Sequence, residues 1–99
     1  MNILTKIDNS SAILIPDGNI DSATADTLEE AISALDIDSL TQLEIDFSKV
    51  YYISSKCLRI LVGAHRKMAS KPIVLSSLNP TVSDIINLSG LSPLFVIKA

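Results

Sequence analysis

Short apolar runs alternate along the chain with longer segments in which apolar residues recur every three or four positions. Residues 2–7 and 11–16 flank a turn-forming Asp-Asn-Ser cluster and predict an opening β-hairpin. Apolar and acidic residues alternate over 43–47, which predicts a third strand with one buried face. The apolar runs 72–75 and 94–97 predict two further strands.

Three segments between these strands have the periodicity of amphipathic helices. The first is expected to begin at residue 21 or 22, the second to cover about 55–69, and the third to cover 79–88 with Gly90 after its end. The side chains expected to be buried are Ala25, Leu28, Ile32 and Leu35 in the first helix, Leu58, Leu61, Val62, His65 and Met68 in the second, and Val82, Ile85, Ile86 and Leu88 in the third.

The second helix is expected to carry a basic stripe opposite its apolar side. Ile60 falls close to that stripe, so we expect it to be an exposed apolar residue. At about 100° per residue, the stripe consists of Lys56, Arg59, Gly63, Arg66 and Lys67.

Alternating strands and helices indicate the α/β class, with helices covering a sheet. We expect a mixed sheet of four or five strands with an N-terminal hairpin at one side, and three helices. The chain has 99 residues, of which 47% are hydrophobic and 19% charged, enough for one compact core. Residues 1–99 are therefore expected to form a single domain.

Composition excludes several function classes. The apolar runs are far shorter than the roughly 20 residues that cross a bilayer, and no secretory signal is visible, so we expect a cytoplasmic protein. Cys57 is the sole cysteine and His65 the sole histidine, which argues against a disulfide, a local metal cluster or a cofactor site. Four aromatic residues and a net charge of −3 argue against nucleic-acid binding.

Charge is unevenly distributed along the sequence. Residues 1–47 contain ten acidic residues and only Lys6 as a base, whereas residues 48–99 contain seven bases and only Asp84 as an acid. Chance variation of solvated surfaces and a surface that steers a partner both account for this distribution.

Ser54 and Ser55 lie where a strand-like run ends and the second helix begins. Both are good N-cap residues, whose side-chain oxygens can accept from free amides of the first turn. The positive end of a helix also favours added negative charge, such as a phosphate.

A catalytic reading of Ser55, Cys57 and His65 as a hydrolase or phosphotransferase lacks the required geometry. Ser55 and His65 are ten residues apart on one helix, about 15 Å of rise, which is too far for a nucleophile and its base. His65 is expected to be a packed core residue and Cys57 a buried small one. The sequence therefore favours a protein without enzymatic activity.

Five segments together resemble the STAS domain of bacterial anti-sigma factor antagonists. They are Asp17–Ala25 (DGNIDSATA), Leu43–Val50 (LEIDFSKV), Tyr52–Ser55 (YISS), Thr81–Leu91 (TVSDIINLSGL) and Phe95–Ile97 (FVI), and they cover nearly the whole chain in the family's order. The resemblance implies a STAS-like fold and a transcription-regulating module. It would bind an anti-sigma factor, often a kinase-like protein, and so free a sigma factor. In such proteins, phosphorylation at the mouth of the second helix abolishes binding.

The chain departs from the family at that mouth. Ser54 stands at the family's acid, Ser55 at its first hydroxyl, Lys56 at the usual phosphoacceptor and Cys57 at the glycine. Lys56 cannot be O-phosphorylated. Either Ser55, or less directly Ser54, has become the acceptor, or the switch is lost and binding is constitutive; the sequence favours loss.

The resemblance and the basic stripe together predict a partner-binding surface. It is expected to comprise Ser54, Ser55, Lys56, Cys57, Arg59, Ile60, Gly63 and Arg66. An anti-sigma factor is the expected partner. The alternative is a STAS subunit of another assembly, such as a stressosome-like scaffold or a partner of a lipid-transport ATPase. The sequence does not fix the oligomeric state.

Overall fold

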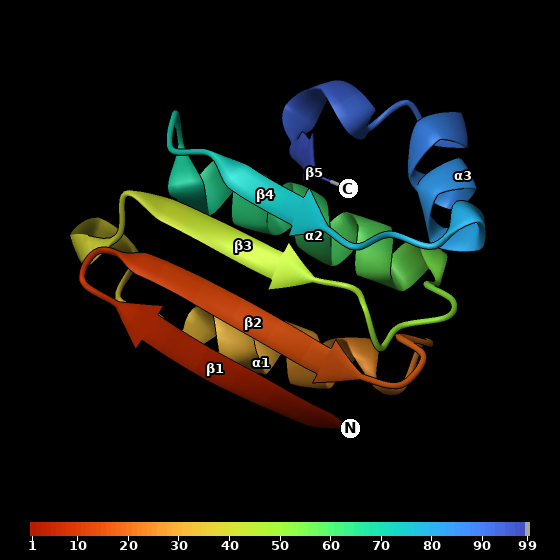
Figure 1. The fold of residues 1–99 in the computed structure, drawn as a ribbon, viewed down its shortest axis with the longest axis horizontal. Coiled ribbons are helices and arrows are strands. Elements are labelled where there is room, and N and C mark those ends of the chain that lie inside the picture. Colours follow the sequence, from red (N-terminus) through yellow and green to blue (C-terminus); the bar gives the residue numbers. More distant parts are fainter. Residues whose placement is uncertain (99) are drawn as a thin grey trace.

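Five strands form one sheet in which spatial order follows chain order, β1-β2-β3-β4-β5 (Figure 1). β1 and β2 pair antiparallel, and all other neighbours pair parallel. The predicted mixed sheet and its hairpin are confirmed, with five strands. In the computed structural model, which describes residues 1–98, the strands are β1 (Asn2–Asp8), β2 (Ser11–Asp17), β3 (Gln42–Asp46), β4 (Ile73–Ser76) and β5 (Val96–Lys98).

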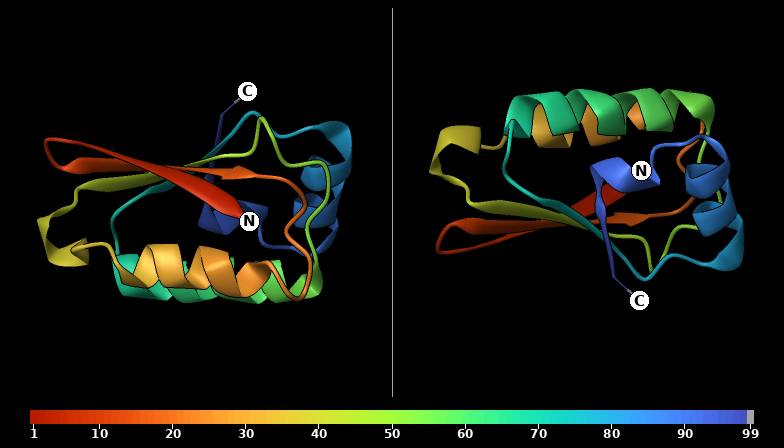
Figure 2. Two further views of the ribbon diagram at one scale, coloured as in Figure 1. Left: turned by 90° about the horizontal axis from the view of Figure 1, so that it is seen from below. Right: turned by 90° about the horizontal axis from the view of Figure 1, so that it is seen from above.

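Each parallel pair is joined by a crossover that contains one helix. Because such crossovers share one hand and each one here moves to the next strand in the same direction, they are expected on one side of the sheet. Figure 2 shows α1 and α2 together on one face, with no helix of residues 1–98 on the other. The helices are α1 (Ala25–Ser33), α2 (Ser55–Met68) and α3 (Pro80–Leu88), and short 3-10 turns cover Ile37–Ser39 and Ser92–Leu94.

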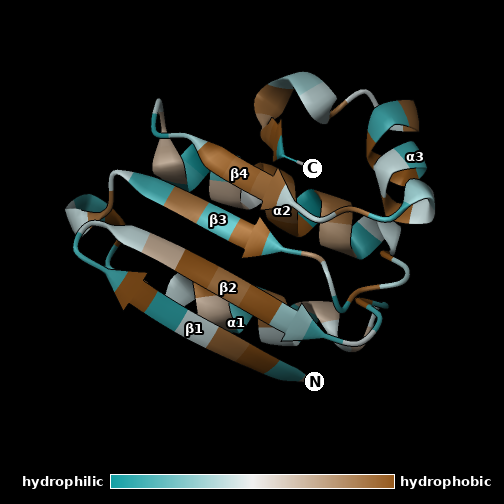
Figure 3. Cartoon of the chain, viewed as in Figure 1, coloured by the Kyte–Doolittle hydropathy of each residue, from teal (hydrophilic) through white to brown (hydrophobic). Residues whose placement is uncertain are grey.

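The core lies between the sheet and the pair α1 and α2. Leu14, Ile45 and Leu75 are neighbours in register across β2, β3 and β4, and all three are fully buried. Leu28 of α1 and Leu61 of α2 are also fully buried. Figure 3 shows the hydrophobic stretches of β2 and β4 that supply this core.

α1 begins at Ala25, three or four residues later than the sequence predicts. A carboxylate oxygen of Asp21 accepts from the amides of Ala23 and Thr24 at 2.9 and 2.8 Å, which makes a side-chain-stabilised turn before the helix. The Thr24 amide is the main reason that the pKa of Asp21 lies below its usual value.

α2 is rotated relative to the sequence prediction. Ile60 is only 7% exposed, so the prediction of an exposed Ile60 is wrong. Ile60 and Ala64 lie beside Ile32 of α1, which means that α1 as well as the sheet covers α2. The buried side chains of α2 are Cys57, Ile60, Leu61, Ala64 and Met68.

The opposite margin of the predicted apolar stripe is only partly covered. Leu58, Val62 and His65 are half-buried rather than central to the core. The His65 ring meets Phe95 edge-on, with ring centroids 6.2 Å apart. The predicted core histidine is therefore a residue at the rim of the core.

α3 covers the end of the core with Val82 and Ile86, as the sequence predicts. Leu88, however, is 89% exposed, and its predicted burial is wrong. At 3.6 residues per turn, Leu88 lies about 140° around the helix from the midpoint of Val82 and Ile86. Gly90 has φ +78° and follows the helix end as predicted.

The rotation of α2 can be tested with two matched truncations. Ile60→Ala should lower the free energy of unfolding by about 2–4 kcal/mol, because it removes buried volume. Leu88→Ala should change it by less than about 0.5 kcal/mol. Urea denaturation of both variants measures the difference. Similar losses for the two variants would contradict the burial described above.

The Cys57 thiol gives the stability an alkaline dependence. Burial raises the pKa of Cys57 from 9.0 to about 12, since a thiolate there would lose its hydration. The folded protein thus holds this proton more tightly than the unfolded chain does. The resulting stabilisation is complete below about pH 9 and is lost as pH rises toward 12.

We therefore expect the free energy of unfolding to fall more steeply above about pH 9 in the native protein than in Cys57→Ala. The difference in slope approaches about 1.4 kcal/mol per pH unit at most. Urea denaturation of both proteins at about pH 8, 9.5 and 11 measures this difference in slope. Parallel slopes would refute the assignment.

Candidate functional site

The loops that follow β2 and β3 are joined at the edge of the sheet where α2 begins. Parallel strands end at a common edge, which makes that edge a usual place for binding sites. Ile20 and Ile53 form an isolated parallel bridge. The Ser54 amide donates to the Ile20 carbonyl at 2.9 Å, and the Ile20 amide donates to the Tyr52 carbonyl at 3.0 Å. The chain entering α2 is thus held by backbone hydrogen bonds.

Asn79 connects the start of α3 to the same loop. Its side-chain oxygen accepts from the Val82 amide at 2.8 Å and caps α3. Its side-chain nitrogen donates to the carbonyls of Val50 and Tyr51 at 3.4 and 3.2 Å. Three loops therefore share one hydrogen-bonded framework.

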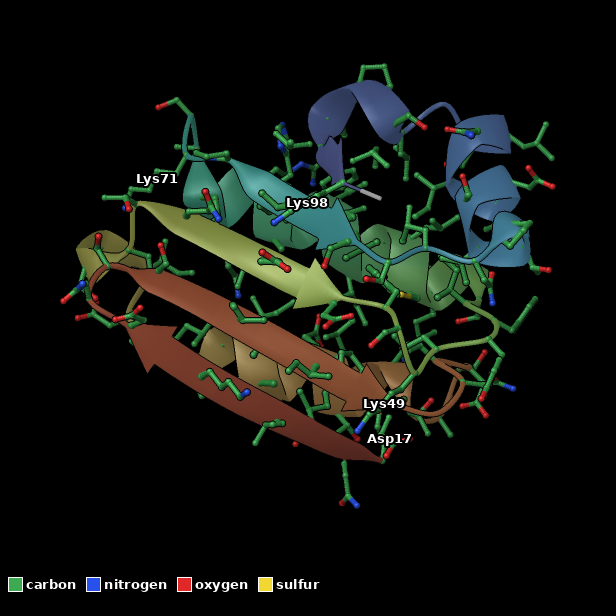
Figure 4. The ribbon with its side chains drawn as sticks, in the orientation of Figure 1. Asp17, Lys49, Lys71 and Lys98 are labelled. Atoms are coloured by element: carbon green, nitrogen blue, oxygen red, sulfur yellow. The ribbon has the colours of Figure 1, made fainter. Side chains whose placement is uncertain are left out.

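Gly18 completes this edge after β2. Its φ of +112° is a conformation that favours glycine, and its amide donates to the Lys49 carbonyl at 3.0 Å. Figure 4 shows Asp17 and Lys49 together at this end of the sheet and Lys71 at the opposite end. The candidate site lies at the end that Asp17 and Lys49 mark.

The two serines have different environments. Ser54 is the N-cap of α2, with extended backbone angles, and its hydroxyl oxygen accepts from the Cys57 amide at 3.3 Å. The predicted cap is thereby confirmed. Ser55 is the first residue of the helix and is exposed. The Ser54 hydroxyl is therefore engaged in capping α2, whereas Ser55 is exposed to solvent.

Lys56 makes a contact that the sequence did not reveal. Its ammonium nitrogen lies 2.7 Å from a carboxylate oxygen of Asp26, in the first turn of α1. A base in a first helical turn is unfavourable by a few tenths of a kcal/mol, and the acid partner offsets this. Thirty residues separate the two, so no local spacing rule could have paired them.

The remaining predicted surface residues are divided between solvent and core. Arg59 and Arg66 are exposed, and Gly63 is half-buried. Cys57 is fully buried, so its side chain faces the core and not a partner. Ile60 forms part of the floor of a hollow between α1 and α2. This hollow is lined by Glu29, Ile32, Arg59, Ile60, Gly63, Ala64 and Lys67.

Two exposed tyrosines precede the serines and were missed from the sequence. Tyr51 is 71% and Tyr52 48% exposed. Exposed aromatic side chains are enriched at the centres of protein interfaces. Two adjacent aromatics before a helix cap were the available signal. A strand-like period would have turned one of them inward, so sequence alone did not predict the exposure of both.

The structure does not assemble a catalytic group from Ser55, Cys57 and His65. The Cys57 thiol is buried with a raised pKa, and His65 lies against Phe95, ten residues along α2 from Ser55. Within residues 1–98, no three His, Cys, Asp or Glu side chains are grouped to hold a metal ion. Over the same range, no helix has the length and apolar character needed to cross a membrane.

The pair between Lys56 and Asp26 should contribute little to stability. The two side chains are 35% and 57% exposed, so solvent screens their attraction. A double-mutant cycle of Lys56→Ala and Asp26→Ala should give a coupling energy below about 1 kcal/mol that shrinks in 1 M salt. Urea denaturation measures it. A salt-independent coupling well above that value would contradict an exposed pair.

Comparison with known proteins identifies the family. Residues 4–97 match the family model described as "Mlab, STAS domain". The anti-sigma-B factor antagonist of Listeria monocytogenes is 30% identical over 83 residues, which are 82% of this chain and 73% of that protein. The anti-sigma-F factor antagonist RsfB of Mycobacterium tuberculosis is 42% identical over 60 residues, 61% of this chain and 49% of that protein.

Solved structures have the same arrangement of helices and strands. An anti-sigma factor antagonist from Mycobacterium paratuberculosis superposes with a TM-score of 0.88 at 30% identity, covering 98% of this chain and 84% of that one. SpoIIAA in its unphosphorylated form gives 0.83 at 17% identity, covering 99% and 89%, which supports the fold alone. The family match, the curated relatives and the shared sheet show that this chain belongs to the STAS domain family.

Proposed function

We propose that this protein is an anti-sigma factor antagonist, a non-enzymatic cytoplasmic module that binds an anti-sigma factor and so releases a sigma factor. The curated relatives carry that name. The observation that carries the proposal is the exposed Ser55 at the start of α2, directly after a loop that is held by backbone hydrogen bonds. Such preorganisation lowers the entropic cost of association.

The proposed contact surface extends from the loop before α2 along its exposed side. Tyr51 and Tyr52 supply apolar area next to Ser55, and Arg59 and Arg66 supply positive charge farther along the helix. An aromatic centre with a charged margin is a common composition for a protein interface. This surface revises the one predicted from sequence, because it adds the tyrosines and excludes the Cys57 side chain.

We also propose that the phosphoserine switch of the family is absent here. Lys56 stands at the position that resembles the family's phosphoacceptor, and its ammonium is paired with Asp26. A phosphoryl group adds about −1.5 to −2 charges at neutral pH and disrupts a fitted interface. Without an acceptor at that position, binding is constitutive.

Binding can be measured by calorimetry with purified anti-sigma factors of the source organism. Lys56→Glu combined with Arg59→Glu should weaken binding by about tenfold or more, since Arg59 lies on the proposed surface and Lys56 directly follows Ser55. Circular dichroism verifies that the variant is folded. Unchanged affinity in the double variant would remove this surface from the proposal.

A matched control reverses two bases on the other side of the molecule. Lys6 follows Thr5, which pairs with the buried Leu14, so Lys6 lies on the sheet face turned away from the helices. Figure 4 shows Lys98 on that face as well. Lys6→Glu with Lys98→Glu should leave the affinity unchanged. Failure of the native protein to bind any anti-sigma factor would favour a subunit role in another assembly.

Loss of the switch has its own test. After incubation with a kinase-type anti-sigma factor and ATP, intact-mass spectrometry should find no stoichiometric phosphorylation. Peptide mapping would locate any phosphate that forms. Phosphate on Ser55 or Ser54 would contradict loss of the switch while leaving the binding proposal intact.

A further inference from the structure

Gly63 lies in the middle of α2, at a position where the helix itself does not require glycine. Glycine is a poor helix former relative to alanine because it loses more backbone entropy on folding. Gly63 has no positive φ, and apart from its chain neighbours and the nearby backbone of α2 no atom of residues 1–98 lies within 4 Å of the position that a Cβ would occupy. Neither backbone conformation nor packing within residues 1–98 accounts for it.

The absent side chain opens the hollow between α1 and α2. Its floor is apolar, formed by the buried Ile32, Ile60 and Ala64. Arg59 and Lys67 lie one helical turn before and after Gly63, so the three residues form a row along one side of α2. A base therefore stands at each end of the opening that Gly63 leaves.

The charges around the hollow indicate what can enter it. Within residues 1–98 the single ion pair joins Lys56 and Asp26, so neither Arg59 nor Lys67 forms an ion pair with an acid in that range. The Lys67 ammonium lies 3.5 Å from the Ser33 hydroxyl of α1, a long and solvent-exposed contact that does not compensate its charge. Glu29 of α1 is the one acid in the lining.

These features distinguish between possible occupants. A second copy would bring the same pair of bases against this one, which is repulsive in a symmetric contact. A polyanion would meet an apolar floor that offers it no polar partner. A peptide segment with an apolar side chain between two acidic residues is complementary to the hollow, because the apolar side chain can contact its floor and the acids can contact the two bases.

We propose that the hollow receives one aliphatic side chain of an anti-sigma factor, on a segment whose flanking carboxylates meet Arg59 and Lys67. This inference rests on the proposed function and adds the place and the chemistry of the contact. Gly63 is the residue that admits the inserted side chain. Its cost to helix stability is thereby explained by binding.

Gly63→Ala separates stability from binding in one variant. Its methyl group enters open space in the free protein, so the melting temperature should rise by about 2–6 °C. The same methyl group occupies the hollow, so affinity for the purified anti-sigma factor should fall by about tenfold. Thermal unfolding and calorimetry measure the two effects.

A matched control and a second variant complete the test. Asp84→Ala introduces alanine at an exposed position of α3, away from the hollow, and should leave affinity unchanged. The second variant, Lys67→Glu, changes a residue that the double variant Lys56→Glu with Arg59→Glu leaves intact. It should lower affinity severalfold and reduce the salt dependence of binding.

The outcomes distinguish the two proposals. If Gly63→Ala binds as tightly as the native protein while Lys56→Glu with Arg59→Glu does not, the hollow is not the insertion site and the proposed function stands. If Gly63→Ala lowers the melting temperature, the open space inferred for its methyl group is contradicted. If the native protein binds no anti-sigma factor, both proposals are overturned.

Discussion

The packing of α2 against two neighbours at once determines which of its residues reach solvent. The sheet covers one side of the helix and α1 covers an adjacent side, where Ile32 lies beside Ile60 and Ala64. The buried arc is therefore displaced toward α1. Arg59 and Arg66 remain outside because neither neighbour extends over that part of the helix. The position of the candidate surface follows from this arrangement.

The strand order makes the arrangement unavoidable. Because β2, β3, β4 and β5 follow one another across the sheet, successive crossovers are on the same face, and α1 and α2 must lie side by side (Figure 2). The same order brings the ends of the parallel strands to one edge. There, Ile20 and Asn79 tie neighbouring loops to the segment before α2. Fold and site are thus consequences of a single topology.

Stabilising and destabilising features lie at different positions along α2. Its start is reinforced by the Ser54 cap and by the pair between Lys56 and Asp26. Its middle carries Gly63, which weakens the helix where tertiary packing is strong enough to compensate. A residue that lowers stability without serving the free fold is expected where function requires it. The helix therefore combines a reinforced start with an open hollow beside its middle.

Local sequence patterns determined the elements of this protein. Alternation over β3, the three-to-four-residue periodicity of the helices, the Ser54 cap and the turn at Gly90 each depend on residues within one turn or strand. The STAS resemblance likewise depends on short segments in order. For this reason the fold class, the hairpin and the place where α2 begins could all be predicted before any coordinates.

Tertiary structure decided what a periodic pattern leaves open. Periodicity determines the direction of the apolar side of α2 only to within about one residue, which is about 100° of rotation around the helix axis. The presence of α1 then decides that Ile60 is buried. The contact of Lys56 with Asp26 joins residues thirty positions apart, and the exposure of Tyr51 depends on loops held by Asn79. The hollow at Gly63 needs two helices. Such features arise from distant segments meeting in space, and no local rule of spacing specifies which segments meet.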